Sequence, residues 1–184
     1  MYGKTLAVII TSMFLLSPSI GLADTGQALA PDYRTPEVVE AEAYLSKSPT
    51  AMNVIKKIHA RNVYYRMPGK NEDDRCEPIW ERVGKSDDAV VIFWNPHMAN
   101  MVDDGSSKMI SPALLLVHEM IHANHYFEDG QKYEERSEKT DIRYDTQEEK
   151  MTIVLERKIA MELGEYQRET HHGRYIDVGV VTGK

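Results

Sequence analysis

Residues 113–117 are apolar on almost every side of a helix, a pattern typical of a helix buried in a protein core. Ser111 and Pro112 come directly before them. A hydroxyl side chain caps the free amides at a helix start, and proline suits the first helical position. The sequence therefore predicts a buried helix that begins after Ser111 and extends to about Tyr126.

The rest of the chain alternates between segments typical of short helices, strands and loops. Helix-start residues and apolar spacing predict three further helices. The first spans 37–45, and the second begins at Pro49 with Met52, Ile55 and Ile58 or His59 on its inner face. The third spans 151–163 and is ended by Gly164. β-branched and aromatic residues predict strands at 62–67, 89–94 and 174–181. Polar and turn-forming residues predict loops at 68–76, 98–108 and 128–145, the last with one turn of helix. The predicted fold class is α+β, a small mixed sheet packed on the buried helix and on a second helix that carries glutamates.

The N-terminus has the layout of a secretory signal peptide: Lys4, an apolar run at 6–16, then small residues. Cleavage is expected after Ala23, or after Ala30. The apolar run is too short for a membrane span, so no membrane association is expected after cleavage. Residues 24–35 then form a linker, and 36–184 a single domain, which suits a chain of 184 residues.

Composition and charge exclude some classes of partner. The net charge is −7, whereas nucleic acid or an anionic membrane would require a basic face. The single cysteine rules out an internal disulfide. We therefore expect no nucleic-acid partner, and we expect a monomer.

The buried helix contains three polar side chains within five residues: His118, Glu119 and His122. Burying polar side chains costs free energy unless hydrogen bonds, paired charges or a metal ion compensate for the lost hydration. Two histidines at i and i+4 lie roughly 40° apart around the helix axis, so both imidazoles can reach one ion. Glu119 points to the side, which suits a general base acting on water. This His-Glu-x-x-His pattern is typical of zinc peptidases, and it predicts a Zn²⁺ site.

A catalytic zinc usually has three protein ligands and one open position. His125 lies on the same helix face, but three ligands cannot converge on one ion from a single straight helix. The helix that begins near residue 148 offers carboxylates instead, with Glu149 and Glu156 one heptad apart on one face. We favour Glu149 as the third ligand, then Glu148, then Glu156. The strand at 89–94, placed before the metal helix, is a candidate for pairing with an extended substrate.

Several motifs together resemble a known family. They are His-Glu-Met-Ile-His-Ala-Asn-His from His118, Glu-Glu-x-x-Thr from Glu148, Phe-Trp-Asn-Pro, Ser-Pro-Ala-Leu, Glu156-Arg157, Glu-Leu-Gly at 162–164 and Arg-Tyr near the end. The chain resembles the NleD/HopH-type effector metalloproteases of pathogenic bacteria over roughly residues 92–175. The resemblance implies a zincin-like metalloprotease domain.

The first two motifs also resemble botulinum and tetanus light chains. In those toxins the second glutamate of the pair binds zinc, which corresponds to Glu149. An arginine and a tyrosine near their site stabilise the oxyanion. Arg174 with Tyr175, or Arg168, are the candidates for that role here.

The predicted function is a zinc endopeptidase, an effector or toxin that cleaves a host protein. The resemblance implies delivery into a host cell, with signalling kinases as the precedent for substrates. Effectors of this family usually lack a cleaved signal peptide, whereas the N-terminus here predicts a secreted or periplasmic protein. One alternative is therefore a periplasmic peptidase acting on envelope proteins. Another is a zinc-stabilised binding domain without turnover, although such a domain would not need Glu119.

Overall fold

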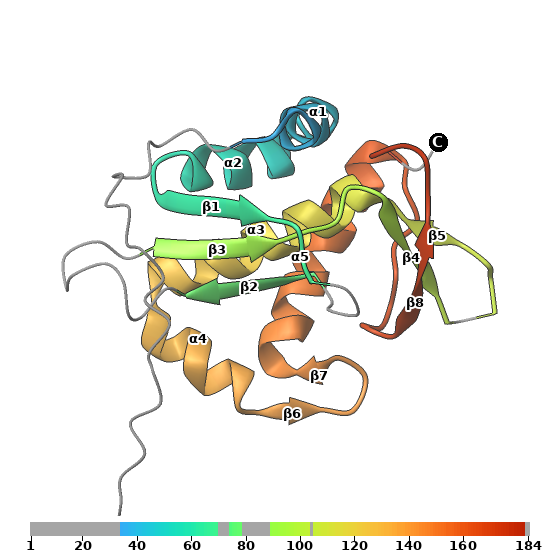
Figure 1. Ribbon diagram of the computed structural model, residues 1–184. Coiled ribbons are helices and arrows are strands. Elements are labelled where there is room, and N and C mark those ends of the chain that lie inside the picture. Colours follow the sequence, from blue (N-terminus) through green and yellow to red (C-terminus); the bar gives the residue numbers. More distant parts are fainter. Residues whose placement is uncertain (1–33, 70–73, 79–88, 104, 183–184) are drawn as a thin grey trace, which may run out of the picture. The chain divides into compact units, whose positions relative to one another are not determined.

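The computed structural model describes residues 34–69, 74–78, 89–103 and 105–182 (Figure 1). The predicted signal peptide, its two cleavage sites and most of the predicted linker lie outside these residues. Among the described helices, none has both the length and the apolar character that a bilayer span needs.

The described part of the chain is a mixed α+β structure with five helices and three small sheets (Figure 1). The helices are α1 (Pro36–Leu45), α2 (Pro49–Ile58), α3 (Pro112–Glu128), α4 (Gly130–Ser137) and α5 (Gln147–Leu163). The strands are β1 (Asn62–Arg66), β2 (Arg75–Pro78), β3 (Ala89–Phe93), β4 (Met98–Val102), β5 (Met109–Ile110), β6 (Thr140–Asp141), β7 (Asp145–Thr146) and β8 (Gly173–Asp177). The predicted α+β class is confirmed at this level.

The first sheet has the order β1-β3-β2, with β1 parallel and β2 antiparallel to β3. The strand predicted at 89–94 is therefore the central strand, and its first four residues are buried. A central strand has no free edge, so the expected pairing of this strand with a substrate is wrong. Among the described strands, β2 is an edge strand of this sheet, and it packs against α3.

The second sheet, with the order β5-β4-β8, corrects the prediction of a loop at 98–108. β4 pairs with β8, about 75 residues away in the chain, for example Met98 with Asp177. Such a non-local partner is not visible in the local composition, which is rich in polar and turn-forming residues only after Val102.

The prediction of a loop at 128–145 is also too simple, because it contains α4 and the two-stranded β6-β7 sheet. α4 is strongly polar and has no fully buried residue, so apolar periodicity could not reveal it. Asp129 begins it, since its side chain accepts a hydrogen bond from the Lys132 amide at 3.1 Å.

Helix α3 lies at the centre of the described structure, in contact with the other four helices and with β2, β3 and β4. Nearly all of its residues are buried, as predicted. The first residue of α3 is tied to the end of β3: Trp94, just after β3, donates a hydrogen bond from Nε1 to the Pro112 carbonyl oxygen at 2.8 Å. Helix α2 packs through Ala51, Val54, Ile55 and Ile58, whereas Met52 is 53% exposed. These four buried residues recur every three or four positions and form one face of the helix, which leaves Met52 on another face. The prediction that Met52 faces inward is therefore wrong.

Candidate metal centre and active site

Two capped helices place the candidate site. Ser111 Oγ accepts a hydrogen bond from the Leu114 amide at 3.1 Å, and this fixes the start of α3. Thr146 Oγ1 accepts one from the Glu149 amide, also at 3.1 Å, and fixes the start of α5. Helices α3 and α5 pack against each other, so the first turn of α5 faces the middle of α3. His118, Glu119, His122 and Glu149 all line one cavity of about 610 Å³.

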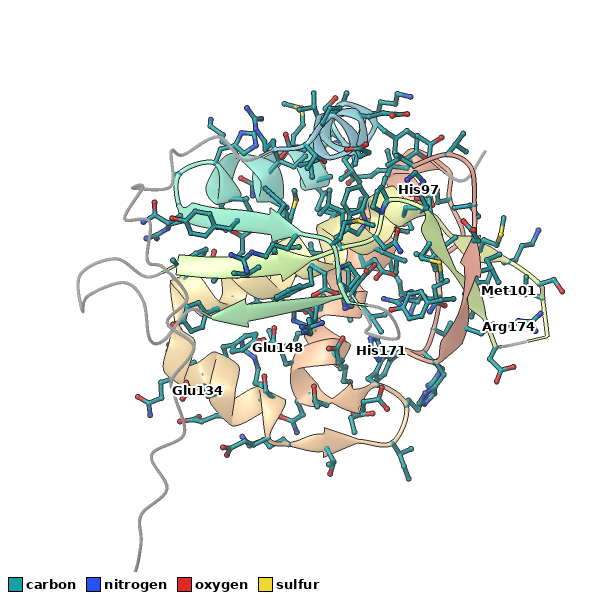
Figure 2. The ribbon with its side chains drawn as sticks, viewed as in Figure 1. His97, Met101, Glu134, Glu148, His171 and Arg174 are labelled. Atoms are coloured by element: carbon teal, nitrogen blue, oxygen red, sulfur yellow. The ribbon has the colours of Figure 1, made fainter. Side chains whose placement is uncertain are left out.

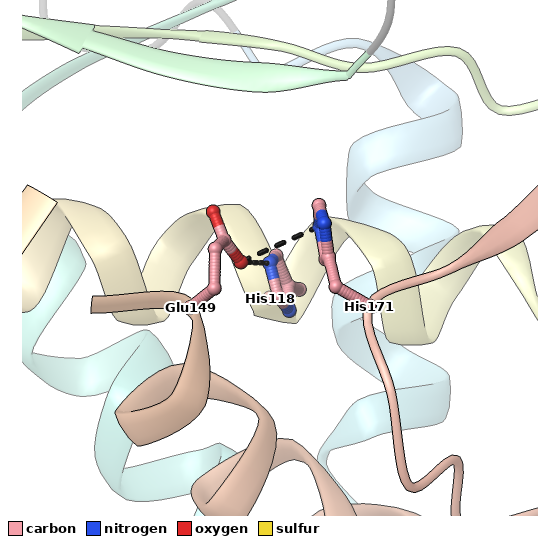
Figure 3. Close-up of side chains that lie close together, drawn as sticks. All are labelled: His118, Glu149 and His171. Atoms are coloured by element: carbon pink, nitrogen blue, oxygen red, sulfur yellow. Dashed lines mark hydrogen bonds and ion pairs between the residues drawn. The ribbon is translucent and has the colours of Figure 1, made fainter. Parts of the chain in front are cut away.

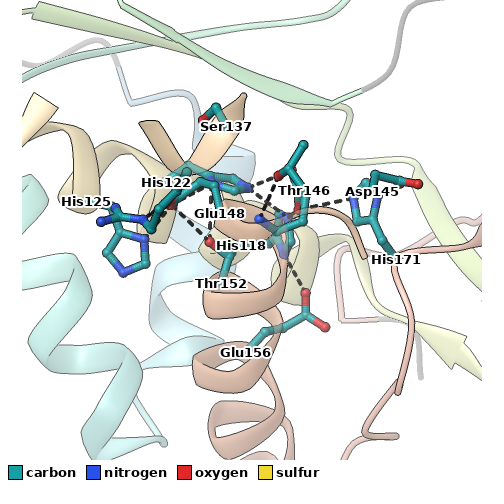
Figure 4. A network of polar contacts seen from close by, with 12 residues as sticks. His118, His122, His125, Ser137, Asp145, Thr146, Glu148, Thr152, Glu156 and His171 are labelled. Atoms are coloured by element: carbon teal, nitrogen blue, oxygen red, sulfur yellow. Dashed lines mark hydrogen bonds and ion pairs between the residues drawn. The ribbon is translucent and has the colours of Figure 1, made fainter. Parts of the chain in front are cut away.

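The two histidines of α3 direct the same ring nitrogen, Nε2, at one another and at Glu149. Figure 4 shows His118 beside His122, and Figure 3 shows Glu149 beside His118. The Nε2 atoms of His118 and His122 are 3.1 Å apart. Glu149 Oε2 lies 3.0 Å from His118 Nε2, and Glu149 Oε1 lies 3.2 Å from His122 Nε2. Ligand atoms at about 2.0–2.1 Å from a tetrahedral zinc are separated by about 3.3 Å. These three side chains therefore have the spacing of a zinc ligand set.

The other ring nitrogen of each histidine is held by a carboxylate of α5 (Figure 4). Glu156 Oε2 lies 2.7 Å from His118 Nδ1, and Glu148 Oε1 lies 3.3 Å from His122 Nδ1. We call Glu148 and Glu156 the outer carboxylates, because they contact the ring nitrogens that face away from the proposed ion. A carboxylate in this position fixes the tautomer of a metal-binding histidine and leaves Nε2 available to the ion. The sequence predicted Glu148 as the second choice of ligand, whereas in the structure it is buried and faces His122 Nδ1 instead of Nε2.

Each outer carboxylate is paired with an arginine as well. Glu148 lies 2.6 Å from Arg136 Nε, and it also contacts His125 Nδ1 at 2.6 Å. Glu156 accepts two hydrogen bonds from Arg168, from Nε at 2.8 Å and from Nη2 at 2.6 Å. Burial alone would raise the pKa of Glu156, but Arg168 and His118 outweigh it and lower this pKa to about 2.

The electrostatic balance of the cluster fits a bound dication. Four buried or half-buried carboxylates, those of Glu119, Glu148, Glu149 and Glu156, face two arginines, which leaves two negative charges. Burial lowers the pKa of His122, yet Glu149 and Glu148 outweigh burial and raise this pKa to about 10. A positive charge is thus favoured where the Nε2 atoms meet, and Zn²⁺ would supply it while taking neutral histidines as ligands.

Glu119 is 7% exposed and reaches the cavity beside the two histidines. Burial raises its pKa, and the nearby histidines oppose the shift. A carboxyl with a raised pKa is a better proton acceptor than an ordinary surface glutamate at neutral pH. Its position and environment suit the role of general base predicted for it.

The three candidates for oxyanion stabilisation lie in different places. Tyr175 and Arg168 line the cavity. Arg174 is on the opposite face of β8, where Nη2 donates to Met101 Sδ at 3.2 Å (Figure 2). Since neighbouring strand residues point to opposite faces, Arg174 cannot join Tyr175 at the site without a change in β8.

Sequence reasoning missed His171, which the structure brings into the cluster (Figure 3). Its Nε2 lies 3.4 Å from Glu149 Oε2, and donor atoms of His118, Glu149 and His171 lie within 4.8 Å of one another. His171 is in the polar segment between α5 and β8, without helical spacing to any other candidate. The tandem His171-His172 was the one signal in the sequence that pointed to it.

We predict that Arg168→Ala destabilises the metal-free protein by about 3–5 kcal/mol, because it leaves the buried Glu156 carboxylate without its cation. Arg168 and Glu156 side chains are only 2% and 1% exposed. Denaturant unfolding in the presence of a chelator measures the change. Arg174→Ala is the matched control, and its free energy of unfolding should change by less than about 0.5 kcal/mol. Equal effects of the two substitutions would contradict the prediction.

Comparison with known proteins gives one result. The model of the Peptidase_M91 family, described as "Effector protein", matches residues 31–169, which include α1 to α5 and all the candidate residues on α3 and α5. Searches of curated proteins and of solved structures found no match.

Proposed function

Because the chain belongs to the Peptidase_M91 family of effector proteins, a family of peptidases, we propose that it is a zinc-dependent endopeptidase that cleaves a host protein. His118, His122 and Glu149 are the proposed zinc ligands, and Glu119 is the proposed general base. The domain is proposed to be zincin-like, with α3 as the metal-binding helix.

One observation carries this proposal. The Nε2 atoms of His118 and His122 and both oxygens of Glu149 meet with separations of 3.0–3.2 Å, while the two Nδ1 atoms are held by other carboxylates. A core built only for stability would not gather so many titratable groups, since replacing buried ion pairs with apolar residues is often stabilising. The arrangement is explained if an ion belongs between them.

Bound zinc supplies a water molecule whose pKa is near 7 and polarises the substrate carbonyl. In the proposed mechanism Glu119 removes a proton from the attacking water as its oxygen bonds to the peptide carbon. Glu119 then gives this proton to the leaving amine as the C–N bond breaks, so it ends the cycle ionised as it began. Glu156 and Glu148 keep His118 and His122 oriented throughout.

Arg168 and Tyr175 are the proposed groups that stabilise charge on the substrate oxygen. Both line the cavity, and Tyr175 is 37% exposed. In the described part of the chain β2 is an edge strand of its sheet, and Asp74 and Arg75 at its start line the same cavity. We propose that an extended substrate segment pairs with β2, instead of with β3 as the sequence alone predicted.

Membership of an effector family indicates delivery of the protein into a host cell, and this supports a host protein as the proposed substrate. A host signalling kinase is the proposed target. Removal of an N-terminal signal peptide after Ala23 or Ala30 stays a prediction, tested by the intact mass of exported protein. Recovery of exported chains that retain Met1 would contradict it.

The experiment that tests the function compares new protein N-termini in a host-cell lysate treated with purified protein. Three samples are needed: the wild type with zinc, the wild type with excess chelator, and Glu119→Gln with zinc. New N-termini found only in the first sample would support a zinc endopeptidase. Cleavage that persists in the other two samples would refute it.

A further inference from the structure

All three histidines around Glu149 share one arrangement. In each, Nδ1 is held by a carboxylate: Glu156 for His118, Glu148 for His122, and Asp145 for His171. In each, Nε2 lies 3.0–3.4 Å from an oxygen of Glu149. A carboxylate on Nδ1 with Nε2 directed at a common point is how proteins prepare histidines as metal ligands. Only two of the three are needed for the ligand set proposed above.

His171 differs from the other two in how firmly it is held. Its side chain is 34% exposed, against 3% and 6% for His118 and His122, and it lies outside any helix or strand. Its distance to Glu149, 3.4 Å, is the longest of the three. The ring stacks on that of His118, with centroids 5.7 Å apart and planes 20° apart. His171 therefore stands at the outer, more solvent-exposed side of the cluster.

Asp145 is held in an unusual backbone conformation at this position. Its φ is +68°, in the left-handed region that residues other than glycine rarely adopt. Its Oδ2 lies 2.7 Å from His171 Nδ1. Residues in such conformations cluster at functional sites, where the surrounding structure maintains them.

We propose that His171 is a fourth, displaceable metal ligand, positioned by Asp145, that closes the coordination shell of the substrate-free protein and leaves it when substrate binds. This proposal rests on the proposed metal site. Four protein ligands would leave a tetrahedral zinc without the open position that catalysis requires. Of the four, His171 is the one on an exposed segment, so it is the ligand that can leave without disturbing α3 or α5.

The first test measures zinc affinity of the full chain by competition with a chelator. His171→Ala should weaken zinc binding about 10–100-fold, and Asp145→Asn should weaken it less. Asparagine tolerates the left-handed conformation, so Asp145→Asn removes mainly the charge. His172→Ala is the matched control, because His172 is the next residue but its Nδ1 is 4.0 Å from Asp145. His171→Gln provides a second variant that keeps a polar side chain.

The second test asks whether the ligand is displaceable. Acetohydroxamate should bind the zinc-loaded His171→Ala variant more tightly than the wild type, because no protein ligand must leave. The Co²⁺-substituted proteins should also differ in visible absorption. If His171→Ala and His171→Gln match the wild type in zinc affinity and Co²⁺ spectrum, His171 is not a ligand and the inference is wrong.

The two proposals can fail separately. If His118→Ala binds zinc as well as the wild type does, the proposed metal site itself is wrong. If His118→Ala loses zinc while both His171 variants keep wild-type affinity, only the role of His171 is wrong.

Discussion

The substitution Glu119→Gln should reduce proteolysis about 10²–10⁴-fold while the protein still binds close to one zinc per chain. The amide keeps the size of the side chain but cannot accept the proton of the attacking water. None of the histidine contacts with Glu148, Glu149 or Glu156 involves Glu119, so the ligand geometry should persist. Cleavage of a host-lysate protein and zinc content by atomic absorption are the two measurements.

Glu128→Gln is the matched control for that experiment, since Glu128 is also on α3 but its side chain is 54% exposed and pairs with Lys57. It should leave both activity and zinc content unchanged. Loss of zinc from Glu119→Gln would show that Glu119 is a ligand, and full activity would show that another group takes the proton.

The sequence alone predicted the parts of the site that depend on local physics. The hydroxyl cap at Ser111 and the apolar run after it predicted α3 and its burial, and the structure confirms both. Gly164, with φ +70°, ends α5 as predicted, because glycine tolerates the left-handed conformation of a helix C-terminus. The i, i+4 spacing then predicted correctly that His118 and His122 lie together.

The parts that the sequence did not predict depend on contacts between distant segments. Neighbouring helix residues such as Glu148 and Glu149 point in different directions. Which groups Glu148 meets depends on the packing of α3, α4 and α5, and in the structure these groups are His122, His125 and Arg136. His171 reaches the cluster because it precedes β8, which pairs with β4 far away in the chain. No local pattern carries that information.

The last prediction concerns Glu149→Ala, which should reduce zinc affinity more than any other substitution on α5. Its two oxygens lie 3.0 and 3.2 Å from the Nε2 atoms of His118 and His122. Without it two histidines of α3, and His171 at the outer side, are left for the ion. Loss of a carboxylate ligand should also lower proteolysis below detection at limiting zinc.

The ranking of three alanine variants tests the assignment. Glu148→Ala and Glu156→Ala should each weaken zinc binding about 10–100-fold, because they release His122 and His118 from their fixed orientations. Helical geometry alone would predict a mild effect of Glu148→Ala, because successive helix residues point roughly 100° apart. The structure predicts a larger effect, since the Glu148 side chain is 2% exposed and also pairs with Arg136. Met151→Ala is the control, because Met151 is on α5 but 46% exposed, and it should keep wild-type affinity. Chelator competition measures all four variants. If Glu149→Ala retains more zinc than Glu148→Ala or Glu156→Ala, the third ligand is one of those two carboxylates.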